Sequence, residues 1–262
     1  MIRYAANLTM LFNEVPFLDR FERAALAGFR AVEFLFAHNV DQEGVERELD
    51  HHGLELVLFD PEGGDFPAGD RGYLCDPDRR AHLRKTVEDA ITTARRLGCR
   101  RLNVLAGNRV EGVADGEMRR AVVENLKSAA PLARAAGVTL LIEALNTWES
   151  PRYFLDRSRL GLEIVREVGE PNVRFQYDAY HMQRMEGELT ATLTKNIEWI
   201  GHIQIADVPG RHEPGTGEVN YPNLLRALEE AGYEGYVGLE YRPSGTTEQS
   251  LAWLPREVRA RR

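Results

Sequence analysis

Four oxygen-bearing side chains in the second half of the chain fall at or near the ends of short β-rich runs. They are Glu143, Asp178, Gln204 and Glu240. Three carboxylates gathered in a confined site repel one another, and their burial is unfavourable unless another group compensates the charge. A divalent cation provides that compensation, and carboxylate and amide oxygens are hard ligands. These residue types therefore predict one divalent metal ion, Mg²⁺ or Mn²⁺ in preference to Co²⁺ or Zn²⁺.

The alternation of side chains along a strand indicates the direction in which each of these groups points. In the run that contains Glu143, the apolar residues Leu140, Ile142 and Ala144 share the opposite side. The same alternation separates Asp178, Gln204 and Glu240 from the apolar residues of their own runs. We therefore expect the apolar sides to pack against helices and the four polar groups to point into one common site.

The elements that must position these groups alternate between β-rich runs and amphipathic stretches of helical spacing. The expected strands cover residues 2–9, 31–36, 54–59, 101–105, 139–145, 173–180, 202–208 and 236–241. The expected helices cover about 16–27, 41–52, 77–97, 115–136, 158–168, 188–199 and 221–231, with a last helix from about 246. Residues 60–76 are too long for a simple connection, so we expect a functional loop there.

Eight strand–helix units predict an α/β fold, a single (β/α)8 TIM barrel that spans residues 1–262 as one domain. Parallel strands need crossover connections, which the intervening helices provide. The first turn lacks the GxGxxG pattern, which disfavours a dinucleotide-binding sheet. In a barrel of this kind the active site lies at the C-terminal ends of the strands, where the four polar groups are expected.

Composition excludes several other classes of protein. The chain has 262 residues, 43% of them hydrophobic and 28% charged, with a formal net charge of −8. The negative charge disfavours nucleic acid as a partner. Two cysteines without a CxxC pair, no N-terminal signal pattern and no apolar run near ~20 residues predict a cytoplasmic protein that does not cross a membrane. Barrels of this kind often form homo-oligomers, and nothing in the sequence identifies an interface.

Several motifs resemble those of the hydroxypyruvate isomerase family, within the xylose-isomerase-like barrels, and the resemblance covers essentially the whole chain. They are Ala5-Ala6-Asn7-Leu8, Gly69-Asp70-Arg71-Gly72, Ile142-Glu143-Ala144-Leu145-Asn146, Asp178-Ala179-Tyr180-His181, His202-Ile203-Gln204-Ile205-Ala206-Asp207 and Pro209-Gly210-Arg211 with Glu213-Pro214-Gly215. The resemblance implies that Glu143, Asp178, Gln204 and Glu240 bind the metal, and that the two glutamates are the catalytic acid and base.

The expected reaction is an aldose–ketose type isomerisation of a small hydroxy-keto acid through an enediolate. The substrate is hydroxypyruvate, which gives tartronate semialdehyde, or a 2-oxo-tetronate. We expect an arginine to bind the carboxylate of this substrate, and Arg71 and Arg211 are the candidates. His181 is expected to bind a substrate oxygen or to support a metal ligand. Asn7 is a candidate for substrate binding or a turn residue.

Three other functions remain open at this point. A sugar 3-epimerase on the same scaffold would use the same two glutamates and return the proton to the carbon from which it came. A metal-dependent hydrolase or endonuclease would favour several metal ions, several histidine ligands and a basic face, whereas this chain has seven histidines and a negative net charge. The third is a sugar-acid binding protein without catalysis.

Overall fold

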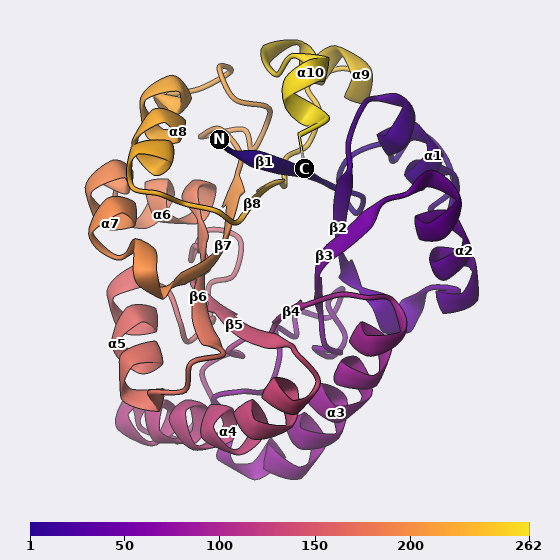
Figure 1. The fold of residues 1–262 in the computed structure, drawn as a ribbon. Helices are drawn as coiled ribbons and strands as arrows, with labels where there is room; N and C mark the ends of the chain where they lie inside the picture. The colour runs from indigo at the N-terminus through magenta and orange to yellow at the C-terminus, as the bar shows by residue number, and fades with distance from the viewer. Residues whose placement is uncertain (262) are drawn as a thin grey trace.

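The computed structural model describes residues 1–261, in which eight parallel strands close a barrel in the order of the sequence. Figure 1 shows the ring of strands with the helices arranged around it. The strands are β1 (Arg3–Asn7), β2 (Ala31–Phe36), β3 (Glu55–Asp60), β4 (Arg101–Asn103), β5 (Thr139–Glu143), β6 (Val173–Asp178), β7 (Ile200–Ile205) and β8 (Tyr236–Leu239). The last strand pairs with the first, which confirms the predicted (β/α)8 barrel.

Most helices lie close to where the spacing of apolar residues predicted them. The α-helices are α1 (Asp19–Leu26), α2 (Gln42–His52), α3 (Arg80–Arg96), α4 (Asp115–Ala135), α5 (Ser158–Val168), α6 (Ala179–Met185), α7 (Leu189–Lys195), α8 (Tyr221–Glu230), α9 (Thr247–Ser250) and α10 (Arg256–Arg259). Short 3-10 turns are η1 (Ala37–Asn39), η2 (Pro77–Arg79), η3 (Ile197–Trp199) and η4 (Leu251–Trp253). Among residues 1–261, we find no helix whose length and apolar character would let it cross a bilayer.

The sixth strand ends two residues earlier than the sequence predicted, and helix α6 was not predicted at all. The expected strand covered 173–180, but β6 ends at Asp178 and α6 begins at Ala179. The cause is local, because Asp178 Oδ1 accepts hydrogen bonds from the backbone N–H groups of Tyr180 at 2.7 Å and His181 at 3.4 Å. A carboxylate in this position satisfies free donors at a helix start and ends the strand there.

Strand β8 also ends early, at Leu239, so Glu240 lies just beyond the strand rather than inside it. The first, fourth and fifth strands are likewise shorter than the expected 2–9, 101–105 and 139–145. Glu240, just beyond the end of β8, therefore lies at the mouth of the barrel, where barrels of this kind have their active sites.

Two apolar clusters account for the packing. The larger lies between strands and helices and includes Ile142, Phe175, Ile203 and Leu239, on the strand faces that the alternation assigned to the helices. A smaller cluster consists of Ala5, Ala31, Val57, Leu58, Leu141 and Tyr236. By alternation, Leu141 shares its side of β5 with Glu143, so this cluster fills the barrel interior below the polar site.

Candidate active site

A cavity of about 420 Å³ opens where the strands end, and it collects most of the residues that the sequence singled out. Six of the eight predicted site residues line it: Arg71, Glu143, His181, Gln204, Arg211 and Glu240. Asp178 is 1% exposed and lies against this wall, beside His181. Asn7 lies apart from the lining, because its amide donates to Glu33 at 3.0 Å and its oxygen accepts from the backbone of Thr9 at 3.1 Å. The role of Asn7 in substrate binding stays a prediction.

The two carboxylate oxygens of Asp178 have different surroundings. Oδ1 caps α6, as described above, whereas Oδ2 is buried and has no hydrogen-bond partner among residues 1–261. A buried oxygen of this kind is unfavourable unless a ligand or ion satisfies it. Oδ2 lies 3.5 Å from His181 Nε2 and 3.8 Å from an Nη of Arg211.

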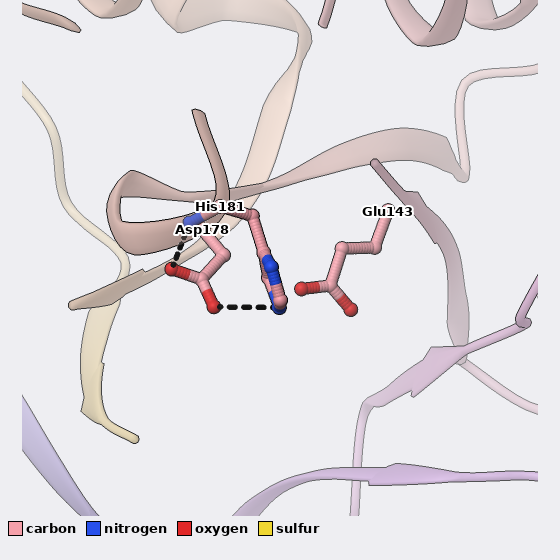
Figure 2. Close-up of side chains that lie close together, drawn as sticks. All are labelled: Glu143, Asp178 and His181. Carbon is pink, nitrogen blue, oxygen red and sulfur yellow. Dashed lines mark hydrogen bonds and ion pairs between the residues drawn. The ribbon is translucent and has the colours of Figure 1, made fainter. Parts of the chain in front are cut away.

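Glu143, Asp178 and His181 form a compact group that could hold a metal ion. One ligand atom from each lies within 4.8 Å of the others, and all three residues are buried. Figure 2 shows the carboxylate of Glu143 pointing from β5 toward the tip of the imidazole, with Asp178 on the other side. Asn103 donates to Glu143 Oε2 at 2.8 Å and so fixes the orientation of that carboxylate.

The hydrogen bonds of His181 determine which of its nitrogens faces the site. Nδ1 accepts from the backbone N–H of Asn146 at 3.1 Å, and the Asn146 amide lies 2.7 Å away. A neutral imidazole that accepts at Nδ1 carries its proton on Nε2. Burial, followed by the charges of Arg211 and Arg184, holds the pKa of His181 well below its usual value, which keeps the ring neutral. Nε2–H is therefore a donor that faces the cavity.

The other two predicted metal ligands are engaged by neighbouring side chains. Glu240 accepts from Arg211 at 2.8 Å. Gln204 accepts from the Gln176 amide at 2.6 Å and donates to Glu33 at 2.8 Å. The four groups thus surround one cavity, but only Glu143 and Asp178 belong to the compact group of possible ligands, and His181 joins them there.

Burial, with repulsion between neighbouring carboxylates as a smaller cause, raises the pKa of the carboxyl groups in the site. Burial, then Glu240, Asp178 and Asp60, raises the pKa of Glu143 well above its usual value. Burial raises the pKa of Glu240 to about 8 and that of Asp178 to about 6, although Arg211 opposes both shifts. Such shifts are frequent at functional sites because they bring acids close to neutral pH. An added cation would lower all of these pKa values by favouring the ionised forms.

The residues present therefore fit a divalent cation. The site offers Asp178 Oδ2, which lacks a partner, and the buried carboxylate of Glu143, which lies close to it. Both are hard oxygen donors of the kind that Mg²⁺ and Mn²⁺ prefer. Arg211 already brings one positive charge to Glu240 and Asp178.

Two residues at strand ends were missed although the rule used for Glu143 would have found them. Asp60 ends β3 and Asn103 ends β4, and both line the cavity. Burial, then Glu240 and Glu33, raises the pKa of Asp60 well above its usual value. Any polar residue that ends a strand of this barrel was a candidate on the same reasoning.

Three further residues were missed for other reasons. Glu33 stands alone among the apolar residues of β2, and such an isolated charge was a usable signal. Glu149 lies in the loop after β5 and accepts from Tyr180 at 2.7 Å and Arg211 at 2.9 Å. Arg242 lines the cavity just past β8. Glu149 lies in a loop that carries no periodic signal, so the sequence could not place it. Arg242 is two residues after Glu240, and the same alternation would have placed it on the same side.

Comparison with known proteins adds independent information. The family model described as "Xylose isomerase-like TIM barrel" matches residues 21–257. The hydroxypyruvate isomerase of Escherichia coli (strain K12) is 45% identical, over 97% of this chain and 98% of that protein. The 2-oxo-tetronate isomerase of Cupriavidus necator is 46% identical, over the same shares of the two chains.

A solved structure from Brucella melitensis has nearly the same fold. It is described as an AP endonuclease of family 2, and it superposes with a TM-score of 0.94 at 45% identity. The match covers 97% of this chain and 98% of that one.

Proposed function

Since this chain belongs to the hydroxypyruvate isomerase family of xylose isomerase-like TIM barrels and is an isomerase, we propose that it isomerises hydroxypyruvate or a 2-oxo-tetronate by metal-assisted proton transfer. Relatives with both names are similar to this chain to almost the same degree, so the proposal covers this class of small hydroxy-keto acids. The cavity of about 420 Å³ has room for a molecule of three or four carbons.

Glu143 and Glu240 are the proposed acid and base. One carboxylate removes a proton from the carbon that bears the hydroxyl group, which leaves an enediolate, and a carboxylic acid returns a proton to the neighbouring carbon. The hydroxyl proton passes to the former carbonyl oxygen, so that the carbonyl and hydroxyl groups exchange places. Both glutamates are buried in the wall of one cavity, and both have a raised pKa, about 8 for Glu240. A carboxyl group with a pKa near neutral pH can both take and release a proton. This pairing is the observation that carries the proposal.

Glu143 and Asp178 would hold the divalent cation, with Glu240 and Gln204 as further ligands once they exchange their present partners. Among these, Asp178 offers the oxygen that no other group satisfies. When bound, the cation supplies a positive charge that polarises a carbonyl oxygen and favours the ionised carboxylates.

His181 is the proposed donor to a substrate oxygen. Its Nε2–H faces the cavity because Nδ1 is occupied by Asn146. To ligate a metal through Nε2, the ring would have to move its proton and lose that hydrogen bond. The proposal therefore assigns His181 to the substrate and leaves the metal to oxygen ligands.

The alternatives have weaker support. An epimerase would use the same two glutamates, and product analysis separates it from an isomerase. The Brucella melitensis structure is described as an endonuclease. A net charge of −8 and a carboxylate-rich cavity favour a small molecule over a DNA backbone.

The test is turnover of hydroxypyruvate, 2-oxo-tetronates and free ketoses, each with and without a chelator, in deuterated water. We expect an acid to be isomerised, the activity to vanish with chelator, and Mg²⁺ or Mn²⁺ to restore it. Deuterium incorporation with an unchanged carbonyl position would identify an epimerase instead. Turnover that is indifferent to chelator would remove the metal from the proposal.

A further inference from the structure

Three arginines line the cavity, and their partners differ. Arg211 pairs with Glu149 at 2.9 Å and with Glu240 at 2.8 Å, and it also lies 3.8 Å from Asp178. Its charge is therefore already compensated by carboxylates of the protein. A substrate carboxylate would have to compete with these groups, so Arg211 is a poor anchor for it.

Arg71 is held in place by neutral groups alone. Its Nη1 donates to the backbone carbonyls of Phe66 at 3.1 Å and Asp70 at 2.7 Å, and Nε donates to Ser150 Oγ at 3.3 Å. The guanidinium also lies 4.4 Å from the centre of the Phe66 ring. Within residues 1–261 it forms no ion pair, and its Nη2 has no acceptor. Arg71 is thus pre-positioned with its charge uncompensated.

Arg242, in the segment after β8, also forms no ion pair within residues 1–261, but its side chain is exposed and is not held in place by other groups. Its backbone is fixed, because its N–H donates to the carbonyl of Arg211 at 2.8 Å and its carbonyl accepts from His212 Nδ1 at 2.7 Å. Its side chain lines the cavity and, in the described part of the chain, makes neither a hydrogen bond nor an ion pair. Two unpaired cations beside a carboxylate-rich site, in a chain of net charge −8, indicate an anionic ligand.

We propose that Arg71 and Arg242, rather than Arg211, bind the carboxylate of the substrate, and that Arg242 makes the site selective for keto acids over neutral ketoses. The inference rests on the proposed function and specifies its substrate class. Arg71 comes from the loop after β3 and Arg242 from the segment after β8, so the carboxylate is held at the mouth of the cavity. The reacting carbons then face Glu143 and Glu240 deeper inside.

The first measurement is kcat and KM for hydroxypyruvate with Arg242→Gln, Arg71→Gln and the control Arg152→Gln in the metal-loaded enzyme. Arg152 is an exposed arginine in the loop after β5, at the same end of the barrel but outside the cavity lining. Loss of one charged hydrogen bond to the substrate should raise KM about 10- to 100-fold with little change in kcat. Arg242→Lys should recover part of the affinity, because it keeps the charge without the paired donors. The control should behave as the unmodified enzyme.

The second measurement is calorimetric binding of tartronate, an unreactive acid, and of the neutral ketose dihydroxyacetone. Arg242→Gln should weaken tartronate binding at least about tenfold and leave dihydroxyacetone binding unchanged. If the enzyme isomerises hydroxypyruvate and neither variant changes KM or tartronate affinity, the arginine assignment is wrong while the proposed function stands. If tartronate binding depends on Arg242 but no acid is isomerised, the proposed function fails while the anion site stands.

Discussion

Two sets of buried carboxylates lie in this barrel, and they differ in how far hydrogen-bond donors surround them. Glu33, in the middle of β2, accepts from His202 at 2.7 Å, Gln204 at 2.8 Å and Asn7 at 3.0 Å, and it is fully buried. The carboxylates at the strand ends face one another instead, and one oxygen of Asp178 has no partner. The first arrangement stabilises the fold, whereas the second leaves a buried carboxylate oxygen of Asp178 available to a ligand.

Strand β8 leaves space for the Glu33 carboxylate at Gly238. A Cβ at Gly238 would overlap the Glu33 carboxylate, so a larger residue there would force β8 or Glu33 to shift. Gln204 belongs to both regions, because it lines the cavity and donates to Glu33. The hydrogen-bonded groups around Glu33 therefore help to position Gln204 in the wall of the cavity. Substitution of Glu33 should mainly lower stability, whereas substitution of the strand-end glutamates should mainly lower activity.

The largest expected effect is on catalysis at the strand ends. Glu143→Gln and Glu240→Gln should each lower kcat by about 10³-fold or more, since each removes a proton-transfer group. Glu143→Gln should not lower the thermal unfolding temperature, because a neutral amide relieves the repulsion from Glu240 and Asp178. Glu240→Gln also removes a buried ion-pair partner of Arg211 and should lower that temperature. Steady-state kinetics and calorimetry measure both effects, with the exposed Glu117→Gln on α4 as the control. Near-normal rates in both variants would refute the pairing.

The opposite outcome is expected at Glu33. Glu33→Ala leaves three buried donors without their acceptor and should lower the free energy of unfolding by about 3–5 kcal/mol. Glu33→Gln keeps the shape and one acceptor, so it should cost less. Urea denaturation measures the difference. A loss below about 1 kcal/mol for the alanine variant would mean that Glu33 is not a stabilising residue.

A smaller effect is expected at Gly238. Gly238→Ala should lower the free energy of unfolding by about 1–3 kcal/mol, because the added methyl group overlaps the Glu33 carboxylate. Gly116→Ala is the matched control, since a Cβ at that position in α4 meets nothing within 4 Å. In a Glu33→Ala background the cost should largely disappear, and additive losses in the double variant would contradict the steric explanation.

The smallest expected effect is a pH dependence of the metal-free protein. The raised pKa of Glu240, about 8, means that the folded state binds a proton that the unfolded chain has already lost. Stability should therefore fall by about 1 kcal/mol between pH 7 and 8.5, as Glu240 ionises beside its neighbours. This window lies above the titration of an unfolded histidine.

Urea denaturation at several pH values with chelator measures this slope. Glu240→Gln should flatten it, and a saturating divalent cation should abolish it by compensating the ionised form. Stability that rises with pH in the unmodified protein over this window would contradict a raised pKa for Glu240.

The order of the strands, the helical covering and the direction of Glu143 could all be predicted from the sequence. Alternation along β5 assigns Leu141 and Glu143 to one side and Ile142 to the other, and the structure agrees. Periodicity is a local property of the chain, so a single sequence carries it. The end of β6 was predicted incorrectly, because the strand pattern continues past Asp178 while the capping hydrogen bonds stop it.

The sequence by itself determined the eight-unit barrel and the residue types that converge at one end, because these depend on spacing and on the chemistry of each side chain. Only the tertiary structure decided which charges are compensated. The sequence alone does not distinguish the surroundings of Arg211 from those of Arg242. In the structure Arg211 is paired with two glutamates, whereas Arg242 forms no ion pair within residues 1–261. Compensation depends on distances between loops that are far apart in the chain, and no local pattern encodes those distances.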